Sequence, residues 1–340
     1  MVAILDQVPK SHRARDLPKV ADLQAKWNWS LPLVSVLMSS YNSRDFIEDA
    51  LSGILMQKTS FPFELVVRDD ASTDGTQTIV QEFVDAYPGV VRAELLSHNS
   101  YARIRPEVAL LGLAKGQYVA WCDADDYWAR DDKIQRQATV LLESSGVVLT
   151  HHLAVKTDRT GQTMLGTVPR ESQRRYMSRV EARYGPKVLG STVMHRNLAV
   201  EPVTANSWMA QSGDFMLFQL LTEHGDIHWM QDFAGVVRRV HEGSSLARQP
   251  AFEVQISRAL SRIFLARANG DRGRADEASH LAIDGTSRLL QLFLSTGILA
   301  HRQLVRLLLS IVWLRVKKGL LWAIRGRDAI RSHLLGQKDI

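Results

Sequence analysis

Four short runs rich in apolar residues, separated by segments of helical spacing, constrain the fold more than any other feature of the chain. The runs cover residues 33–38, 63–67, 91–96 and 118–122. The segments between them carry apolar residues at the spacing of an amphipathic helix, at 45–55, 76–87 and 106–114. Continuous apolar runs are typical of parallel strands that are buried on both faces. The alternation therefore predicts right-handed βαβ units on a mostly parallel sheet, an α/β fold.

Polar side chains follow three of these runs, at the points where the predicted strands end. Tyr41 and Asn42 follow the first run, Asp69 and Asp70 follow the second, and an acidic cluster at 123–126 follows the fourth. The carboxyl ends of parallel strands meet at one edge of a sheet, where open α/β folds bind ligands. We therefore expect one ligand site at this edge.

The acidic cluster places Asp123, Asp125 and Asp126 within four residues. If the strand geometry continues by one step, Asp123 and Asp125 lie on the same side, because side chains alternate along a strand. Carboxylates at this spacing repel one another unless a cation neutralises them, and Mg²⁺ commonly binds one or two carboxylates together with phosphate oxygens. The spacing alone leaves two alternatives open, a metal–diphosphate site and an acidic turn before a helix that Asp131 caps.

The composition is that of a globular chain of 340 residues, about two domains in length. Its single cysteine, Cys122, excludes an intramolecular disulfide and a cysteine-rich zinc site, and a reducing compartment fits this count. Residues 1–29 are too polar for a secretory signal, and we find no apolar run long enough to cross a bilayer.

The net charge of +6 is concentrated near the C-terminus. Residues 302–331 contain eight basic residues and one acidic residue, a net charge of 8 − 1 = +7, so the remainder of the chain sums to −1. A basic tail of this kind indicates an anionic partner, either a membrane surface or nucleic acid.

The second half of the chain is less regular. We expect strands at 147–155, 188–195, 226–230 and 233–240, and helices at 178–183, 215–224, 252–268, 274–294 and 301–324. The predicted organisation is a leader at 1–30, a catalytic domain at 31–245 and a basic, amphipathic helical region at 246–340. Within the domain, residues 31–145 form the nucleotide-binding part and residues 146–245 the acceptor part.

Taken in order and spacing, five of these segments resemble the family 2 inverting glycosyltransferases. They are LVSVLMSSYNSRDFIEDALSGILMQ, FELVVRDDASTDGT, GQYVAWCDADDYWARDDKIQRQ, GDFMLFQLL and RRVH. Each is weak by itself, whereas the combination is specific. The resemblance implies the GT-A fold, a Rossmann-like, mostly parallel central sheet flanked by helices, here with a helical C-terminal extension.

The resemblance also implies which residues bind the nucleotide. The tyrosine position, Tyr41, lies near the base, and Asp70 accepts a hydrogen bond from the base, while the adjacent carboxylate caps the turn that follows. The alternative for Tyr41 is that it only closes the strand end. The expected nucleotide-binding set is Ser40, Tyr41, Asn42, Asp69, Asp70 and Asp123.

The remaining roles concern the metal, the diphosphate and the acceptor. The resemblance implies Mg²⁺ or Mn²⁺ bound by Asp125, with Asp123 and His241 as further ligands. Asp214 is the expected general base, although an aspartate at this place also suits a helix N-cap. The expected diphosphate and substrate contacts are Arg239, His241, Asp126 and Thr192.

The function implied is a metal-dependent transfer of a sugar from a nucleotide sugar, UDP-linked by expectation, to a glycan or lipid-linked acceptor. The expected setting is bacterial polysaccharide or lipopolysaccharide assembly in the cytoplasm, at the inner face of the plasma membrane. The helix at 301–324 either lies in the membrane interface or docks on the domain, and nucleic acid is not an expected partner.

Two other classes remain as alternatives. A sugar-phosphate nucleotidyltransferase needs a glycine-rich loop after the first strand, where this chain has SSYNSRDF. A non-catalytic module would use the basic tail to bind a membrane or nucleic acid.

Overall fold

The computed structural model describes residues 11, 16–27, 30–100, 105–169, 175–182, 188–199, 213–243, 251–271 and 273–295. The chain divides into two units, and each is described by itself. The first comprises Met1–Glu201 with Gly213–Arg248, and the second comprises Pro202–Ser212 with Gln249–Ile340. The predicted helix at 301–324 lies outside the described residues.

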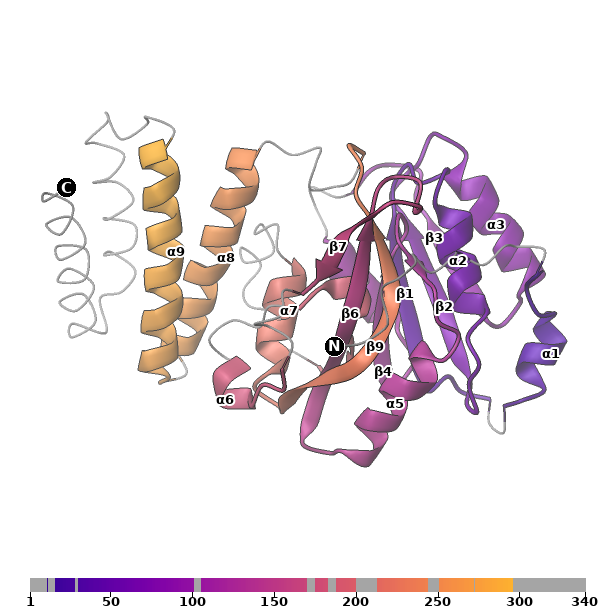
Figure 1. Ribbon diagram of the computed structural model, residues 1–340, viewed down its shortest axis with the longest axis horizontal. Coiled ribbons are helices and arrows are strands. Elements are labelled where there is room, and N and C mark those ends of the chain that lie inside the picture. The colour runs from indigo at the N-terminus through magenta and orange to yellow at the C-terminus, as the bar shows by residue number, and fades with distance from the viewer. Residues whose placement is uncertain are drawn as a thin grey trace, which may run out of the picture. The chain divides into compact units, whose positions relative to one another are not determined.

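The first unit is built on a sheet that contains nine strands within the described residues, in the order β3-β2-β1-β4-β8-β6-β9-β5, with β7 paired to β6 (Figure 1). Its first half confirms the predicted parallel strands: β1 (Val34–Ser40), β2 (Phe63–Asp69), β3 (Val91–Leu95) and β4 (Tyr118–Asp123). The connecting helices are α2 (Ile47–Leu55), α3 (Thr76–Ala86) and α4 (Pro106–Leu113), and the short α1 (Val20–Gln24) precedes them.

The second half of this unit departs from the prediction in three places. The segment predicted as a strand at 188–195 is a 3-10 turn, η3 (Gly190–Thr192), and the short antiparallel strand β8 (Met194–Arg196). The two predicted closing strands are one strand, β9 (Asp226–Arg239), which contains Asp232 in a left-handed conformation. The elements β5 (Tyr127–Trp128) and β7 (Met164–Val168) were not predicted. The other elements are α5 (Lys133–Glu143), β6 (Val147–Thr157), α6 (Arg179–Ala182) and α7 (Gly213–Leu221).

The predicted helix cap at Asp131 is wrong. Helix α5 begins at Lys133, and the residue before it makes no capping hydrogen bond with its side chain. Asp131 instead forms an ion pair with Lys58 at 2.6 Å, and its backbone carbonyl accepts a hydrogen bond from the Lys58 N–H. These two contacts hold Asp131 against the end of α2 and leave it one residue short of the cap position.

Side-chain alternation along the strands divides the core between the two faces of the sheet. Val36 and Met38 of β1 point into a cluster with residues of α2, α3 and α5, whereas Leu37 points to the opposite face. That opposite face is covered by α4, through Leu110, and by α7. The helices therefore form a layer on each side of the sheet (Figure 1).

The described part of the second unit is a pair of helices, α8 (Ala251–Asp271) and α9 (Ala275–Ser295). A Cβ on Gly285 would lie 2.8 Å from the Ala259 carbonyl oxygen, so the two helices approach closely at this glycine. Asp284 of α9 accepts a hydrogen bond from Arg262 of α8 across the same contact, and another from Arg288 of its own helix. None of the helices within the described ranges combines the length and apolar character needed to span a bilayer.

Candidate active site

The register of the parallel strands brings three predicted site residues together. Ser40 of β1 is paired with Asp69 of β2, and Ser39 of β1 is paired with Asp123 of β4. The Ser40 hydroxyl donates a hydrogen bond to Asp69 at 2.6 Å. The carboxyl edge of the sheet therefore carries the polar cluster that the sequence predicts.

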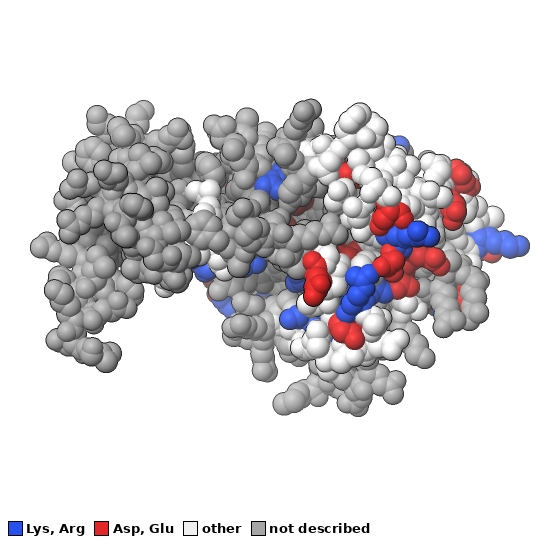
Figure 2. Space-filling model, turned by 90° about the horizontal axis from the view of Figure 1, so that it is seen from above, with Lys and Arg blue, Asp and Glu red and all other residues white. Residues whose placement is uncertain are grey.

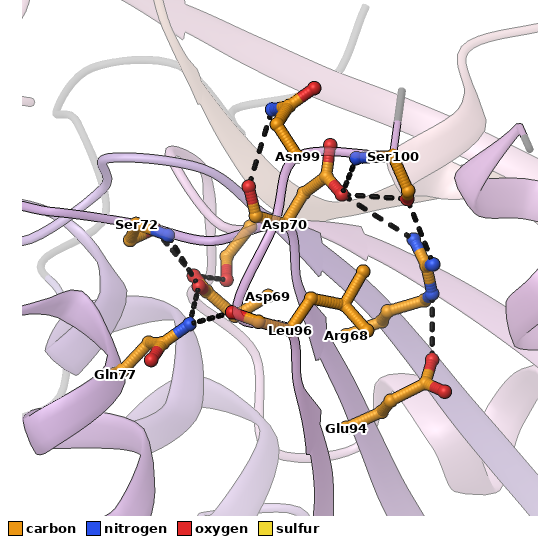
Figure 3. A network of polar contacts seen from close by, with 10 residues as sticks. Arg68, Asp69, Asp70, Ser72, Gln77, Glu94, Leu96, Asn99 and Ser100 are labelled. Atoms are coloured by element: carbon orange, nitrogen blue, oxygen red, sulfur yellow. Dashed lines mark hydrogen bonds and ion pairs between the residues drawn. The ribbon is translucent and has the colours of Figure 1, made fainter. Parts of the chain in front are cut away.

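Asp69 and Asp70 are adjacent but have different surroundings. The Asp69 carboxylate is fully buried and accepts hydrogen bonds from Ser40, from the N–H and hydroxyl of Ser72, and from Gln77. Asp69 therefore caps the turn that begins at Ser72 (Figure 3). Its acceptor positions are occupied by the protein itself, which makes it a structural residue of the strand end.

Asp70 is held on the other side of the strand by a separate network. One of its oxygens accepts hydrogen bonds from the N–H and the hydroxyl of Ser100, at 2.8 and 2.7 Å, and lies 3.9 Å from the Arg68 guanidinium (Figure 3). Arg68 also pairs with Glu94 and donates to Ser100. These contacts fix the orientation of the Asp70 carboxylate before any ligand binds.

Tyr41 and Asn42 lie at the end of β1. The Tyr41 side chain is 43% exposed, which leaves its ring accessible to a planar ligand. Asn42 has a positive φ of 50°, and it bridges two loops: its N–H donates to the Ser72 hydroxyl and its side-chain oxygen accepts from the Thr73 N–H. Asn42 thus ties the first strand end to the turn after the second.

The three carboxylates of the acidic cluster converge. Asp123, Asp125 and Asp126 each offer an oxygen within 4.8 Å of the others, and the set runs from an exposed residue to a buried one. Asp123 is an exposed residue, but partial desolvation of its carboxyl group together with the charge of Asp125 raises its pKa to about 7. The same two causes raise the pKa of Asp126 well above its usual range.

One oxygen of Asp126 is buried without a hydrogen-bond partner among the described residues, while the other accepts from the Arg239 N–H. An unsatisfied carboxylate oxygen beside two further carboxylates is the donor set that a hard divalent cation prefers. The residues present therefore fit Mg²⁺ or Mn²⁺.

His241 completes this cluster. Its Nε2 lies 3.1 Å from an Asp125 oxygen, and its ring packs on Phe46 with centroids 4.5 Å apart. His241 thus lies directly beside Asp125, at the edge of the acidic cluster.

Arg239 is directed away from open solvent. It is buried, it forms an ion pair with Asp49 of α2, and its guanidinium lies 4.6 Å from the Tyr127 ring centroid. It also donates to the Asp125 carbonyl at 3.4 Å. Arg239 therefore holds the acidic loop against α2, a role that the sequence did not indicate.

Asp214 is the second residue of α7, and its carboxylate is exposed. One of its oxygens accepts a hydrogen bond from the Phe215 N–H at 2.7 Å, and the other would lie 4.0 Å from a Cβ on Gly190. Thr192, predicted to line the substrate, is instead completely buried and donates to the Leu189 carbonyl. Thr192 supports the turn beside Asp214 and does not form an open surface.

Lys133 and Gln137, which follow the acidic cluster in the sequence, have a packing role in the structure. Both are completely buried, and the Lys133 ammonium donates to Gln137 at 2.7 Å. Gln137 in turn donates to the Thr192 carbonyl at 3.0 Å. The pair connects α5 to the turn next to Asp214.

Glu107 was missed by the sequence reasoning. It lies at the start of α4, and its charge contributes to the raised pKa of Asp123. The available signal was Pro106-Glu107 at the start of the helix after the third strand, an arrangement that is common at helix N-termini.

Comparison with known proteins shows which family and which fold the chain resembles. Residues 35–196 match the family described as Glycosyl transferase family 2. TuaG of Bacillus subtilis, named as a teichuronic acid biosynthesis glycosyltransferase, is 41% identical over 119 residues, which are 35% of this chain and 45% of TuaG. WfgD of Escherichia coli, named as a UDP-Glc:alpha-D-GlcNAc-diphosphoundecaprenol beta-1,3-glucosyltransferase, is 36% identical over 115 residues, 33% of this chain and 42% of WfgD.

The aligned part thus spans less than half the length of these relatives. Among solved structures, S. aureus TarS 1–349 in complex with UDP-GlcNAc matches with a TM-score of 0.56 at 18% identity, covering 86% of this chain and 79% of that one. This likeness concerns the fold.

Residues 35–196 are therefore similar to the family 2 glycosyltransferases, and the fold is of the GT-A type. Its named relatives, TuaG and WfgD, are glycosyltransferases of bacteria, which favours transfer chemistry over the nucleotidyltransferase alternative.

Proposed function

We propose that the protein is a metal-dependent, inverting glycosyltransferase. It moves a sugar from a UDP-sugar to a hydroxyl group of a glycan or lipid-linked acceptor, in the synthesis of a bacterial polysaccharide. The observation that carries the proposal is the convergence of Asp123, Asp125 and Asp126 with His241 at the carboxyl end of β4, at the edge of the sheet that also carries Asp70.

The donor half of the site extends from Asp70 to the acidic cluster. Asp70, oriented by Ser100 and Arg68, accepts a hydrogen bond from the base, and the accessible Tyr41 ring packs on it. Asp125, Asp123 and His241 would hold Mg²⁺ or Mn²⁺. When bound, such an ion neutralises the charge that develops on the departing diphosphate. Asp126 and Arg239 keep the loop in position.

The acceptor half depends on Asp214. Its carboxylate takes the proton from the acceptor hydroxyl as the oxygen attacks the anomeric carbon, on the side opposite the diphosphate. The bond from that carbon to the diphosphate oxygen breaks, UDP leaves, and the configuration inverts. The accessible position of Asp214 at the start of α7 supports this role. General-base catalysis of this kind contributes about 10²–10⁴-fold to the rate.

A screen of nucleotide sugars tests the proposal. The thermal unfolding of the protein is measured with UDP-, GDP- and dTDP-sugars, with and without Mn²⁺, and UDP-sugars with Mn²⁺ are expected to stabilise it most. The Asp214→Asn variant should keep this stabilisation and lose about 10²–10⁴-fold of the transfer rate. Asp85→Asn, at an exposed position of α3, is the matched control. Full transfer activity in Asp214→Asn would place the base elsewhere.

A location at the cytoplasmic face of the membrane is part of the proposal. Figure 2 shows acidic and basic side chains intermixed on the described surface seen from above, not gathered into a patch of one sign. The support for an anionic membrane as partner therefore comes from the basic residues at 302–331, outside the described residues, and from the diphosphoundecaprenol-linked substrate for which WfgD is named. Deleting residues after 300 should reduce binding to anionic vesicles while donor hydrolysis continues.

A further inference from the structure

Helices α4 and α7 lie next to each other on one face of the sheet. Leu110 of α4 packs on Leu37, Val66 and Val119 of three central strands. Leu111, the next residue, also packs against the cluster that contains Leu217 and Phe218 of α7. The two helices are therefore joined through a shared apolar contact.

Both helices begin at the carboxyl edge of the sheet. Helix α4 connects the parallel strands β3 and β4, so it runs against them and begins where β3 ends. Helix α7 leads into β9, whose first residue, Asp226, pairs with Val147 at the start of β6, and β6 runs in the same direction as β4 because each is antiparallel to β8. The N-termini of α4 and α7 thus face the same site.

Each of these helices has a carboxylate at its second residue, Glu107 in α4 and Asp214 in α7. One oxygen of Glu107 is buried and has no hydrogen-bond partner among the described residues. Burial raises the pKa of Glu107 and the charge of Asp214 raises it further, whereas a hydrogen bond from its own backbone N–H and the charge of Arg105 lower it. Asp214 and Glu107 both contribute to the raised pKa of Asp123, so the three carboxylates lie within range of one another's charge.

A helix N-terminus explains an acidic residue, but it does not explain a buried oxygen that accepts no hydrogen bond beside two like charges. Such an arrangement costs stability, and it is typical of a group whose partner is a ligand. Hydroxyl groups of an uncharged sugar or polyol supply the missing O–H donors, whereas a phosphate at this place would be repelled by three carboxylates.

We propose that Glu107 binds the acceptor: it accepts a hydrogen bond from one hydroxyl of an uncharged sugar or polyol while Asp214 deprotonates the hydroxyl that attacks the donor. The inference rests on the proposed function and names the chemical class that its acceptor half recognises. Glu107 thereby determines acceptor specificity and takes no part in donor binding.

The test compares the Glu107→Gln variant with Glu48→Gln. Glu48 is the matched control because it is also the second residue of its helix, α2, but is exposed. The donor is the nucleotide sugar that stabilises the protein best, and the acceptor probes are glycerol and the methyl glycosides of glucose, galactose, mannose and N-acetylglucosamine. Three quantities are measured: the rate of donor hydrolysis by water, the Kd for UDP with Mn²⁺, and KM and kcat for each probe.

Glu107→Gln is expected to raise KM for the accepted probe by about tenfold, the effect of weakening one hydrogen bond to a charged group. Donor hydrolysis and the Kd for UDP should stay within about twofold of the wild type, and Tm should be unchanged or higher. Glu48→Gln should change none of these. A shorter carboxylate, in Glu107→Asp, should give a KM between the wild type and Glu107→Gln.

An unchanged KM in Glu107→Gln would overturn the inference, as would a parallel loss of UDP affinity, which marks a structural role. Donor hydrolysis by the wild type without transfer to any uncharged probe would also overturn it, while leaving the donor half of the proposed function in place. If the wild type neither binds nor hydrolyses a nucleotide sugar, both this inference and the proposed function are wrong.

Discussion

Arg239 of β9 and Asp49 of α2 form an ion pair that holds the acidic loop against α2, the helix that follows β1. The same arginine donates its backbone N–H to Asp126 and a side-chain N–H to the Asp125 carbonyl. Residues nearly 200 positions apart in the chain thus fix the loop that offers carboxylates to a cation. The geometry of the acidic cluster depends on this contact as much as on its own sequence.

Replacing Arg239 with methionine should therefore weaken both the fold and cation binding. The change leaves Asp49 without its partner and removes the side-chain bond to the Asp125 carbonyl, while the backbone bond to Asp126 remains. We therefore expect a loss of about 1–3 kcal/mol in the free energy of unfolding and weaker stabilisation by Mn²⁺ with UDP. Arg159→Met is the control, because Arg159 also lies over the Phe46 ring but is exposed and paired with exposed Asp45. Urea unfolding measures the stability, and an Arg239→Met loss no larger than the control would contradict the anchoring role.

The same substitution should have different effects at Asp69 and Asp70, the adjacent aspartates at the end of β2. Asp70→Asn is expected to lower the affinity for UDP by about tenfold or more, because the base loses a charged acceptor, and to leave Tm nearly unchanged. Asp69→Asn should lower the stability by about 1–3 kcal/mol, because Asp69 accepts bonds from Ser40, Ser72 and Gln77 inside the protein. Isothermal titration with UDP and thermal unfolding distinguish the two, and equal effects of both changes on UDP affinity would refute the division.

The first half of the sheet could be predicted from the sequence because its signals are local. The strands β1, β2, β3 and β4 are short segments rich in apolar residues, and each is bounded by residues that do not continue it. Their parallel order brings Ser40, Asp69 and Asp123 to one edge without any further information. The candidate site could be located from these strand ends alone.

The remainder depends on contacts between distant segments. The two residues of β5 become a strand only because they pair with β9, more than 100 positions further on, and no local pattern marks them. The sequence does not distinguish Glu107 from an ordinary acidic residue in a first helical turn, because what sets it apart is that α4 packs beside α7. The same holds for Arg239, whose partner Asp49 lies on another element.

His241 should affect cation binding without affecting the fold. His241→Phe keeps a ring to pack on Phe46 but removes the nitrogen that lies 3.1 Å from Asp125. We expect Tm without metal to be nearly unchanged and the Mn²⁺-dependent increase in Tm to be smaller, with EDTA abolishing the increase in the wild type. His224→Phe, at an exposed position on the first unit, is the control. An undiminished response to Mn²⁺ in His241→Phe would remove this residue from the ligand set.

Lys133 gives a prediction about pH that is independent of any ligand. The residue is completely buried at the first position of α5, with its ammonium 4.0 Å from the Trp128 ring centroid, and burial lowers its pKa from 10.5 to about 7. Between these two values the unfolded chain binds a proton that the folded protein lacks. Stability attributable to Lys133 therefore rises as pH increases from about 7 to about 10, by up to about 1.4 kcal/mol per pH unit.

The Lys133→Met variant should lose this dependence. Methionine fills similar space without a charge, so the variant should be more stable than the wild type at pH 7, and the difference should shrink as pH rises towards 10. Lys58→Met is the control: pairing with Asp131 raises the pKa of exposed Lys58, so its contribution does not change in this range. The free energy of unfolding in urea is measured at about four pH values between pH 7 and pH 10. Curves for the wild type and Lys133→Met that run parallel would show that the folded protein keeps Lys133 charged, held by Gln137 and the face of Trp128.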